Sequence, residues 1–231
     1  MSDGYPYRPR VLRGAFVELG LSLPPLFVAF QFNPTQLVRN HGLSFSFPAD
    51  PGDTAAKAPP LTDRQRRARV SNLFDLQKEQ LVTVSDHTIG FDIRLDATDR
   101  IDDNDPVAEQ FGIAPQLATL EQMMYPKDES ELAGALLGDA DGFSFTRGAN
   151  PPLVLFVFGR KRVLPVNVES MDITETEFSA DLYPVQATVA VSLTVIEGKN
   201  PPYRASKAAA EALSLLNVAD TAALHDVVIP G

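Results

Sequence analysis

The sequence predicts a mainly β protein of the α+β class, with one central helical segment and a C-terminal helix. Apolar and polar residues alternate with a period of two in several segments, as they do in strands that bury one face. Helix start and stop signals occur only in a central stretch and near the end. The 231 residues contain no cysteine, and a chain of this length can bury a core without disulfides.

Strands are expected wherever the period of two persists. The clearest is residues 185–195, where every odd position is apolar, and residues 89–95 repeat the pattern. Residues 26–32 and 43–47 show it in shorter form. Residues 153–158 are apolar at every position, which predicts a strand covered on both faces.

The segment 163–173 contains a change of phase. Val166 and Val168 are apolar at even positions, whereas Met171 and Ile173 are apolar at odd positions. A slip of one residue sends half of a strand's apolar side chains to the solvent face. A β-bulge near Glu169 and Ser170 is therefore expected, because a bulge absorbs one extra residue and bends the strand.

Two helices are expected in the centre and one near the end. Asp105 and Pro106 supply a cap and a first-turn proline, and Gly112 follows as a stop. Pro115 opens the second helix. The third covers residues 203–216. Their apolar stripes are Leu117, Leu120 and Met124 in the second helix and Ala209, Leu213 and Leu216 in the third.

The expected organisation is one β domain over residues 1–200 and a C-terminal helix and tail over 201–231. Long loops are inserted at about 48–80 and 125–152, and both are read as surface excursions of the one domain.

Composition excludes several classes of function. Asp and Glu outnumber Lys and Arg by 30 to 20, giving a net charge of −10, which disfavours nucleic acid and anionic membranes as partners. Without cysteine there is no thiol nucleophile or thiolate metal site.

The start lacks a basic and an apolar region, so no secretory signal is expected. The longest apolar run, 153–158, is too short to span a membrane, and a soluble, cytoplasmic protein is expected.

Candidate chemical groups are few, and each has a simpler interpretation. His41 and His87 lack a neighbouring nucleophile or metal-ligand motif, so packed or solvated histidines are favoured. The acids between Asp99 and Asp105 lack the glycine and glutamate of a calcium loop, and a solvated approach to a helix N-terminus is favoured. Asp172, Glu175 and Glu177 could pair as glycosidase carboxylates, but nothing else marks them. We expect no catalytic residue, no cofactor and no metal.

The densest basic patch consists of Arg64, Arg66, Arg67 and Arg69. No aromatic residue lies within it to stack bases. Contact with an acidic surface of another subunit is the first interpretation, and an ordinary solvated face is the second. Normal assembly of an Arg66 and Arg67 charge-reversal variant would contradict the first.

Five segments carry a resemblance to a known family. They are FQFNPTQL (30–37), FDIRLDA (91–97), PPLVLFVFG (151–159), VESMDITETEF (168–178) and PVQATVAVSL (184–193). In this order they resemble the tube-type proteins of contractile injection systems, which are phage-tail-like particles. The resemblance covers about residues 14–197.

The resemblance implies a tail-tube fold, in which two antiparallel sheets pack as a small barrel or sandwich with a flanking helix. The same resemblance implies assembly into rings, with a hexamer expected. It also implies a position in the baseplate, as the adaptor that links the inner tube protein to the hub and spike and starts tube assembly. Relatives of this adaptor often carry a peptidoglycan-binding LysM module at the C-terminus, for which residues 203–231 are too short. An ordinary inner tube protein remains an alternative, as does a β-barrel that binds a small ligand or glycan. Subunit contacts are expected at residues 64–69 and 125–149.

Overall fold

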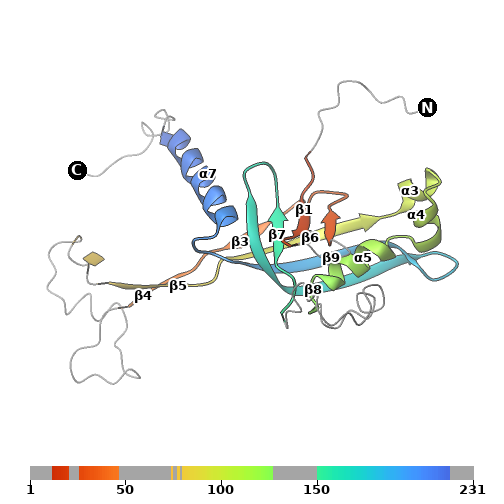
Figure 1. Ribbon diagram of the computed structural model, residues 1–231, viewed down its shortest axis with the longest axis horizontal. Coiled ribbons are helices and arrows are strands. Elements are labelled where there is room, and N and C mark those ends of the chain that lie inside the picture. The colour runs from red at the N-terminus through yellow and green to blue at the C-terminus, as the bar shows by residue number, and fades with distance from the viewer. Residues whose placement is uncertain are drawn as a thin grey trace, which may run out of the picture. The chain divides into compact units, whose positions relative to one another are not determined.

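Antiparallel strand pairing dominates the computed structural model, which describes residues 12–20, 26–46, 74, 77–78, 80–126 and 150–218 (Figure 1). The strands are β1 (Ala15–Glu18), β2 (Phe27–Ala29), β3 (Val38–Asn40), β4 (Leu43–Ser46), β5 (Leu81–Val84), β6 (Thr88–Asp96), β7 (Val154–Val157), β8 (Val163–Phe178) and β9 (Pro184–Val195). They form a seven-stranded sheet, in the order β2-β1-β7-β8-β9-β6-β3, and a two-stranded sheet of β4 and β5. The predicted mainly β class with two antiparallel sheets is confirmed, and the described strands form no closed barrel.

The long β8–β9 hairpin is the centre of the seven-stranded sheet. Its register shifts between Val168 and Ser170, so the bulge predicted from the change of phase is confirmed. Two further shifts lie near the tip, around Glu177. Residues 187, 189, 191, 193 and 195 of β9 are buried, as are residues 89, 91, 93 and 95 of β6. Both strands therefore bury the face that alternation predicted.

A cluster of phenylalanines fills the core on one face of this sheet. Phe16 of β1 lies directly opposite Phe156 of β7, and the two rings are 5.9 Å apart between centroids. Phe30 and Phe91 complete the cluster. Because this core lies on one side, Leu155 and Val157 on the other face of β7 are only half-buried. The expectation that β7 is fully covered on both faces is therefore wrong.

Short helices follow β6 and complete the core. They are α3 (Thr98–Asp102), α4 (Pro106–Phe111) and α5 (Ala114–Gln122). Asp105 caps α4 as predicted, since its Oδ1 accepts from the backbone N–H of Val107 at 3.0 Å. Gly112 ends α4 with φ of 58°, a left-handed conformation that glycine adopts without a Cβ penalty. In α5, Leu117 and Leu120 are buried as expected, but Met123 rather than Met124 completes the buried stripe.

The last described element is α7 (Pro201–Val218), which confirms the predicted C-terminal helix. Its first turns are attached to β8: the Ser206 hydroxyl donates to the Val163 carbonyl at 2.7 Å and accepts from the Val163 N–H at 2.9 Å. Tyr203 packs against the core. Leu213 and Leu216, expected to lie in an apolar stripe, are 52% and 68% exposed.

The chain divides into two compact units. Residues 1–38 and 89–231 form the first, and residues 39–88 form the second. The seven-stranded sheet belongs mainly to the first unit, whereas β4 and β5 belong to the second. Within the described ranges, no helix is long and apolar enough to cross a membrane.

Candidate functional site

The residues predicted to make subunit contacts lie mostly beyond the part of the chain that the structure describes. Arg64, Arg66, Arg67 and Arg69 all fall outside it, as do residues 127–149 of the second predicted contact segment. Of that segment Tyr125 is described, and its side chain is 55% exposed. Both contact predictions therefore stay predictions.

Two of the three histidines come together in the second unit. The rings of His41 and His87 lie 3.7 Å apart between centroids. His87 is buried and His41 is exposed. Pairing of β4 with β5 explains the contact, because it also joins the residues flanking these strands, as in the 2.9 Å bond from the Ser85 N–H to the Gly42 carbonyl. Two imidazoles supply only half of the four ligands of a structural zinc site. His225 lies outside the described residues.

The acids between Asp99 and Asp105 belong to the helical segment rather than to an irregular loop. Asp105 caps α4 and accepts a hydrogen bond from the Arg100 guanidinium, with Nη2 and Oδ2 2.7 Å apart. This bond from Arg100 holds the pKa of Asp105 below its ordinary value. Asp105 is thus accounted for by capping and ion pairing, which are structural roles.

The three acids considered as glycosidase carboxylates are exposed along β8. The register is continuous from Ser170 to Glu175. Side chains three positions apart on a regular strand point to opposite faces. Asp172 and Glu175 therefore cannot face one substrate together.

The most distinctive surface of the second unit is the two-stranded sheet. In its register Leu43 is opposite Val84 and Phe45 is opposite Val82, so these four side chains share one face. All are between 46% and 64% exposed. The expectation that residues 43–47 form a half-buried strand is wrong for the described part: Leu43 and Phe45 alternate with serines, but nothing described covers them. We name Leu43, Phe45, Val82 and Val84 the ribbon face.

Among the described strands, the seven-stranded sheet has two at its margins. β2 and β3 are the two edge strands, and each carries an exposed apolar side chain, Phe27 at 64% and Val38 at 44%. An open edge presents backbone donors and acceptors to another strand. These edges are therefore suited to pairing with another chain.

One hollow bears on the ligand-binding alternative. It has a volume of about 440 Å³ and is lined by Met123, Asn150, Pro151, Pro152, Leu153, Asn167 and Val168. Binding pockets for small molecules combine apolar walls with a few converging polar groups. Here the polar side chains of the lining are two asparagines, both exposed, so the hollow favours no particular ligand.

Sequence reasoning missed two surfaces. One is the ribbon face, and the other is a group of exposed basic side chains around α7, namely Arg160, Lys161, Arg204 and Lys207. The pattern of residues 43–47 was visible, but alternation does not tell which side chains lack a cover. No protein-family model matches this chain, and no curated protein sequence matches it.

Proposed function

We propose that this chain is a structural subunit that assembles into rings in a contractile injection system. Its place there is the baseplate adaptor that joins the inner tube to the hub and spike. It acts through contact geometry and carries no reaction centre, and it works in the cytoplasm where such particles assemble.

The observation that carries the proposal is the ribbon face. An isolated two-stranded sheet is marginally stable in water, and this one exposes four apolar side chains on one side. Burying them against another chain recovers roughly 25 cal/mol per Å² of apolar surface. A subunit with an apolar face that no described part of the chain covers is suited to assembly.

The placement of the resembling segments gives further support. FDIRLDA, PPLVLFVFG, VESMDITETEF and PVQATVAVSL fall on or beside β6, β7, β8 and β9, and FQFNPTQL follows from β2. They therefore mark neighbouring positions of one sheet, although they are scattered in sequence. Two different open edges, β2 and β3, suit a head-to-tail contact, which closes into a ring when its rotation permits.

The helix α7 favours the adaptor over the ordinary inner tube protein. A tube subunit stacks on copies of itself at both ends, whereas an adaptor meets a different protein at one of them. The 18 residues of α7 follow the last strand of the sheet and end in exposed leucines. They add a surface beyond the sheet for such a neighbour.

The test is native mass measurement and negative-stain imaging of the purified full chain at increasing concentration. We expect annular particles with a mass of about 150 kDa, as six chains of 25.1 kDa would give. A chain that remains monomeric at concentrations near 100 μM, about the range at which weak assembly contacts saturate, would contradict the proposal.

A further inference from the structure

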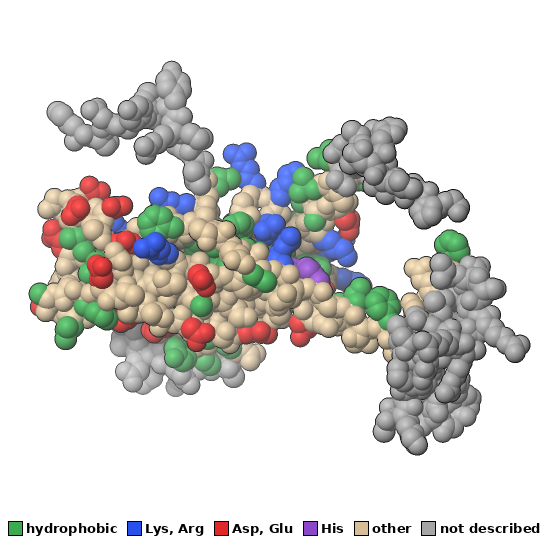
Figure 2. Space-filling view, turned by 180° about the vertical axis from the view of Figure 1, so that it is seen from behind, with side chains coloured by type: hydrophobic (Ala, Val, Ile, Leu, Met, Phe, Trp, Pro, Cys, Tyr) green, Lys and Arg blue, Asp and Glu red, His purple; other side chains and the backbone are tan. Residues whose placement is uncertain are grey.

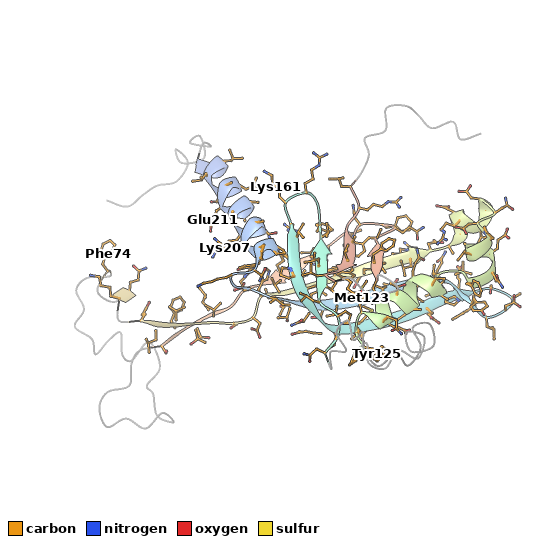
Figure 3. The ribbon with its side chains drawn as sticks, viewed as in Figure 1. Phe74, Met123, Tyr125, Lys161, Lys207 and Glu211 are labelled. Carbon is orange, nitrogen blue, oxygen red and sulfur yellow. The ribbon has the colours of Figure 1, made fainter. Side chains whose placement is uncertain are left out.

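A cluster of basic side chains gathers where the β7–β8 turn meets α7, in a chain that is acidic overall. Arg160 and Lys161 lie in the turn, and Arg204 and Lys207 lie in the first turns of α7. The Ser206–Val163 hydrogen bonds hold these two elements together, and Figure 3 shows Lys161 and Lys207 on them. All four side chains are exposed. We name them the basic cluster.

Apolar surface continues from the basic cluster along α7. Pro202, Ser206 and Ala209 of α7 are half-buried, at spacings of four and three residues. The same alternation of spacing leads on to Leu213 and Leu216, and residues at such spacings share one face of a helix. The helix face that contains Ser206 thus continues past the contact with β8. At its far end it carries the exposed side chains of Leu213 and Leu216.

The tip of the β8–β9 hairpin combines the opposite charge with apolar side chains. Glu177 and Asp181 are exposed there, and Phe178 and Leu182 are 51% and 80% exposed. The tip is fixed to α4, since the Phe111 and Tyr183 rings meet edge to face at 5.3 Å. Figure 2 shows acidic side chains crowding the end that carries α3 and α4. The exposed acids on or beside these two helices are Asp99, Asp102, Asp103 and Glu109.

The backbone of the tip holds a leucine in a turn conformation that favours glycine. Leu182 has φ of 64°, a left-handed conformation that costs a bulky L-residue energy. The turn is otherwise well bonded, with the Ser179 N–H donating to the Tyr183 carbonyl at 2.8 Å. Glycine would fit this position at lower cost, and leucine instead presents an apolar side chain to solvent. Residues held in sparsely populated backbone conformations cluster at functional sites.

We propose that the basic cluster and the exposed end of α7 form one docking surface, and that its occupant is the β8–β9 tip of a second copy. Charge complementarity identifies the occupant: the basic cluster meets Glu177 and Asp181, while Leu182 packs on the leucines of α7. Both surfaces belong to the first unit. The contact is head-to-tail, and it rests on the proposed function because it names the partner in that assembly.

Cross-linking tests the contact directly, because the chain has no cysteine of its own. Two full-length variants, Lys207→Cys and Asp181→Cys, are mixed and oxidised. We expect a disulfide-linked heterodimer in at least tenfold excess over that formed by Lys207→Cys with Gln122→Cys, an exposed position on α5. Equal yields for the two mixtures would overturn the proposal.

Charge exchange provides the second test. Lys161→Glu with Lys207→Glu is expected to weaken self-association at least tenfold at 50 mM NaCl, and the effect shrinks at 500 mM because salt screens exposed charges. Adding Glu177→Lys and Asp181→Lys to the same chain restores association. Unchanged association in the double variant would show that the second copy is not the occupant. Failure of the charge exchange to restore association, together with binding of heparin by the basic cluster, would show the same.

Leu182→Gly separates this contact from a purely structural role of the tip. We expect the variant to raise the Tm, because the strain is relieved, and to weaken self-association at least fivefold. Unchanged association would contradict the docking role. Rings that persist in all these variants would overturn this inference and leave the proposed function standing, whereas a native chain that never associates would overturn both.

Discussion

The same alternating pattern has opposite outcomes in the two units. In β6 and β9 the apolar positions are buried, and Ile93 and Val189 are inaccessible to solvent. In β4 and β5 the apolar positions form the ribbon face, which is exposed. Alternation therefore determines that a strand has an apolar face, but the covering of that face depends on whether another part of the same chain reaches it. Where none does among the described residues, a second chain is the natural cover.

The sharpest test of this contrast is a large-to-small change in each region. Phe156→Ala removes a ring that is fully buried among Phe16, Phe91 and Phe158, so we expect the free energy of unfolding to fall by about 3–5 kcal/mol. Urea denaturation measures it. Phe45→Ala in the ribbon face is the matched control and should cost less than about 1 kcal/mol. Equal losses at the two positions would remove the distinction between the regions.

The next effect concerns the junction of α4 with the sheet. A Cβ at Gly112 would lie 2.1 Å from the Pro184 carbonyl oxygen, and φ is 58°. We expect Gly112→Ala to destabilise the chain by about 2–3 kcal/mol, through backbone strain and this clash together. Gly159→Ala is the control: its φ is 83° but nothing lies within 4 Å of the added Cβ, so it should cost about 1 kcal/mol. The prediction fails if both variants show the same midpoint in urea.

Much of the first unit could be predicted from local patterns. The bulge after Val168, the cap at Asp105 and the stop at Gly112 each follow from a rule that involves a few neighbouring residues. Local patterns do not reveal which strands become neighbours in the sheet, such as β1 beside β7. Of the predicted stripe in α7, Ala209 is half-buried but Leu213 and Leu216 are exposed, because the covering of a helical face depends on tertiary structure.

The candidate surfaces were harder to predict because they combine distant residues. The basic cluster joins Lys161 to Lys207 through the contact of Ser206 with Val163. His41 and His87 likewise meet only because β4 pairs with β5. A correct guess of the β4–β5 register would have found the histidine contact, whereas no sequence pattern locates α7 beside the β7–β8 turn.

A smaller effect is expected for the charge at the cap of α4. The pKa of Asp105 is lowered by its hydrogen bond from Arg100. The ionised Asp105 carboxylate therefore stabilises the fold fully above the ordinary carboxyl pKa. This stabilisation is lost as the pH falls through the lowered pKa of the folded state. Asp105→Asn keeps an acceptor for the cap and removes the charge. We expect a lower Tm than the native chain at pH 7 and a difference that vanishes near pH 2. A difference independent of pH would contradict the ion-pair assignment.

Sedimentation velocity of the native chain beside a Phe45→Ser, Val82→Ser variant tests the central claim most directly. Both positions lie in the ribbon face and are about half exposed, at 46% and 50%. We expect the native chain to sediment as a ring, and the variant to sediment as a folded monomer whose Tm is nearly unchanged. A variant that forms the same ring, or a native chain that stays monomeric throughout, would show that this face is not where neighbouring copies meet.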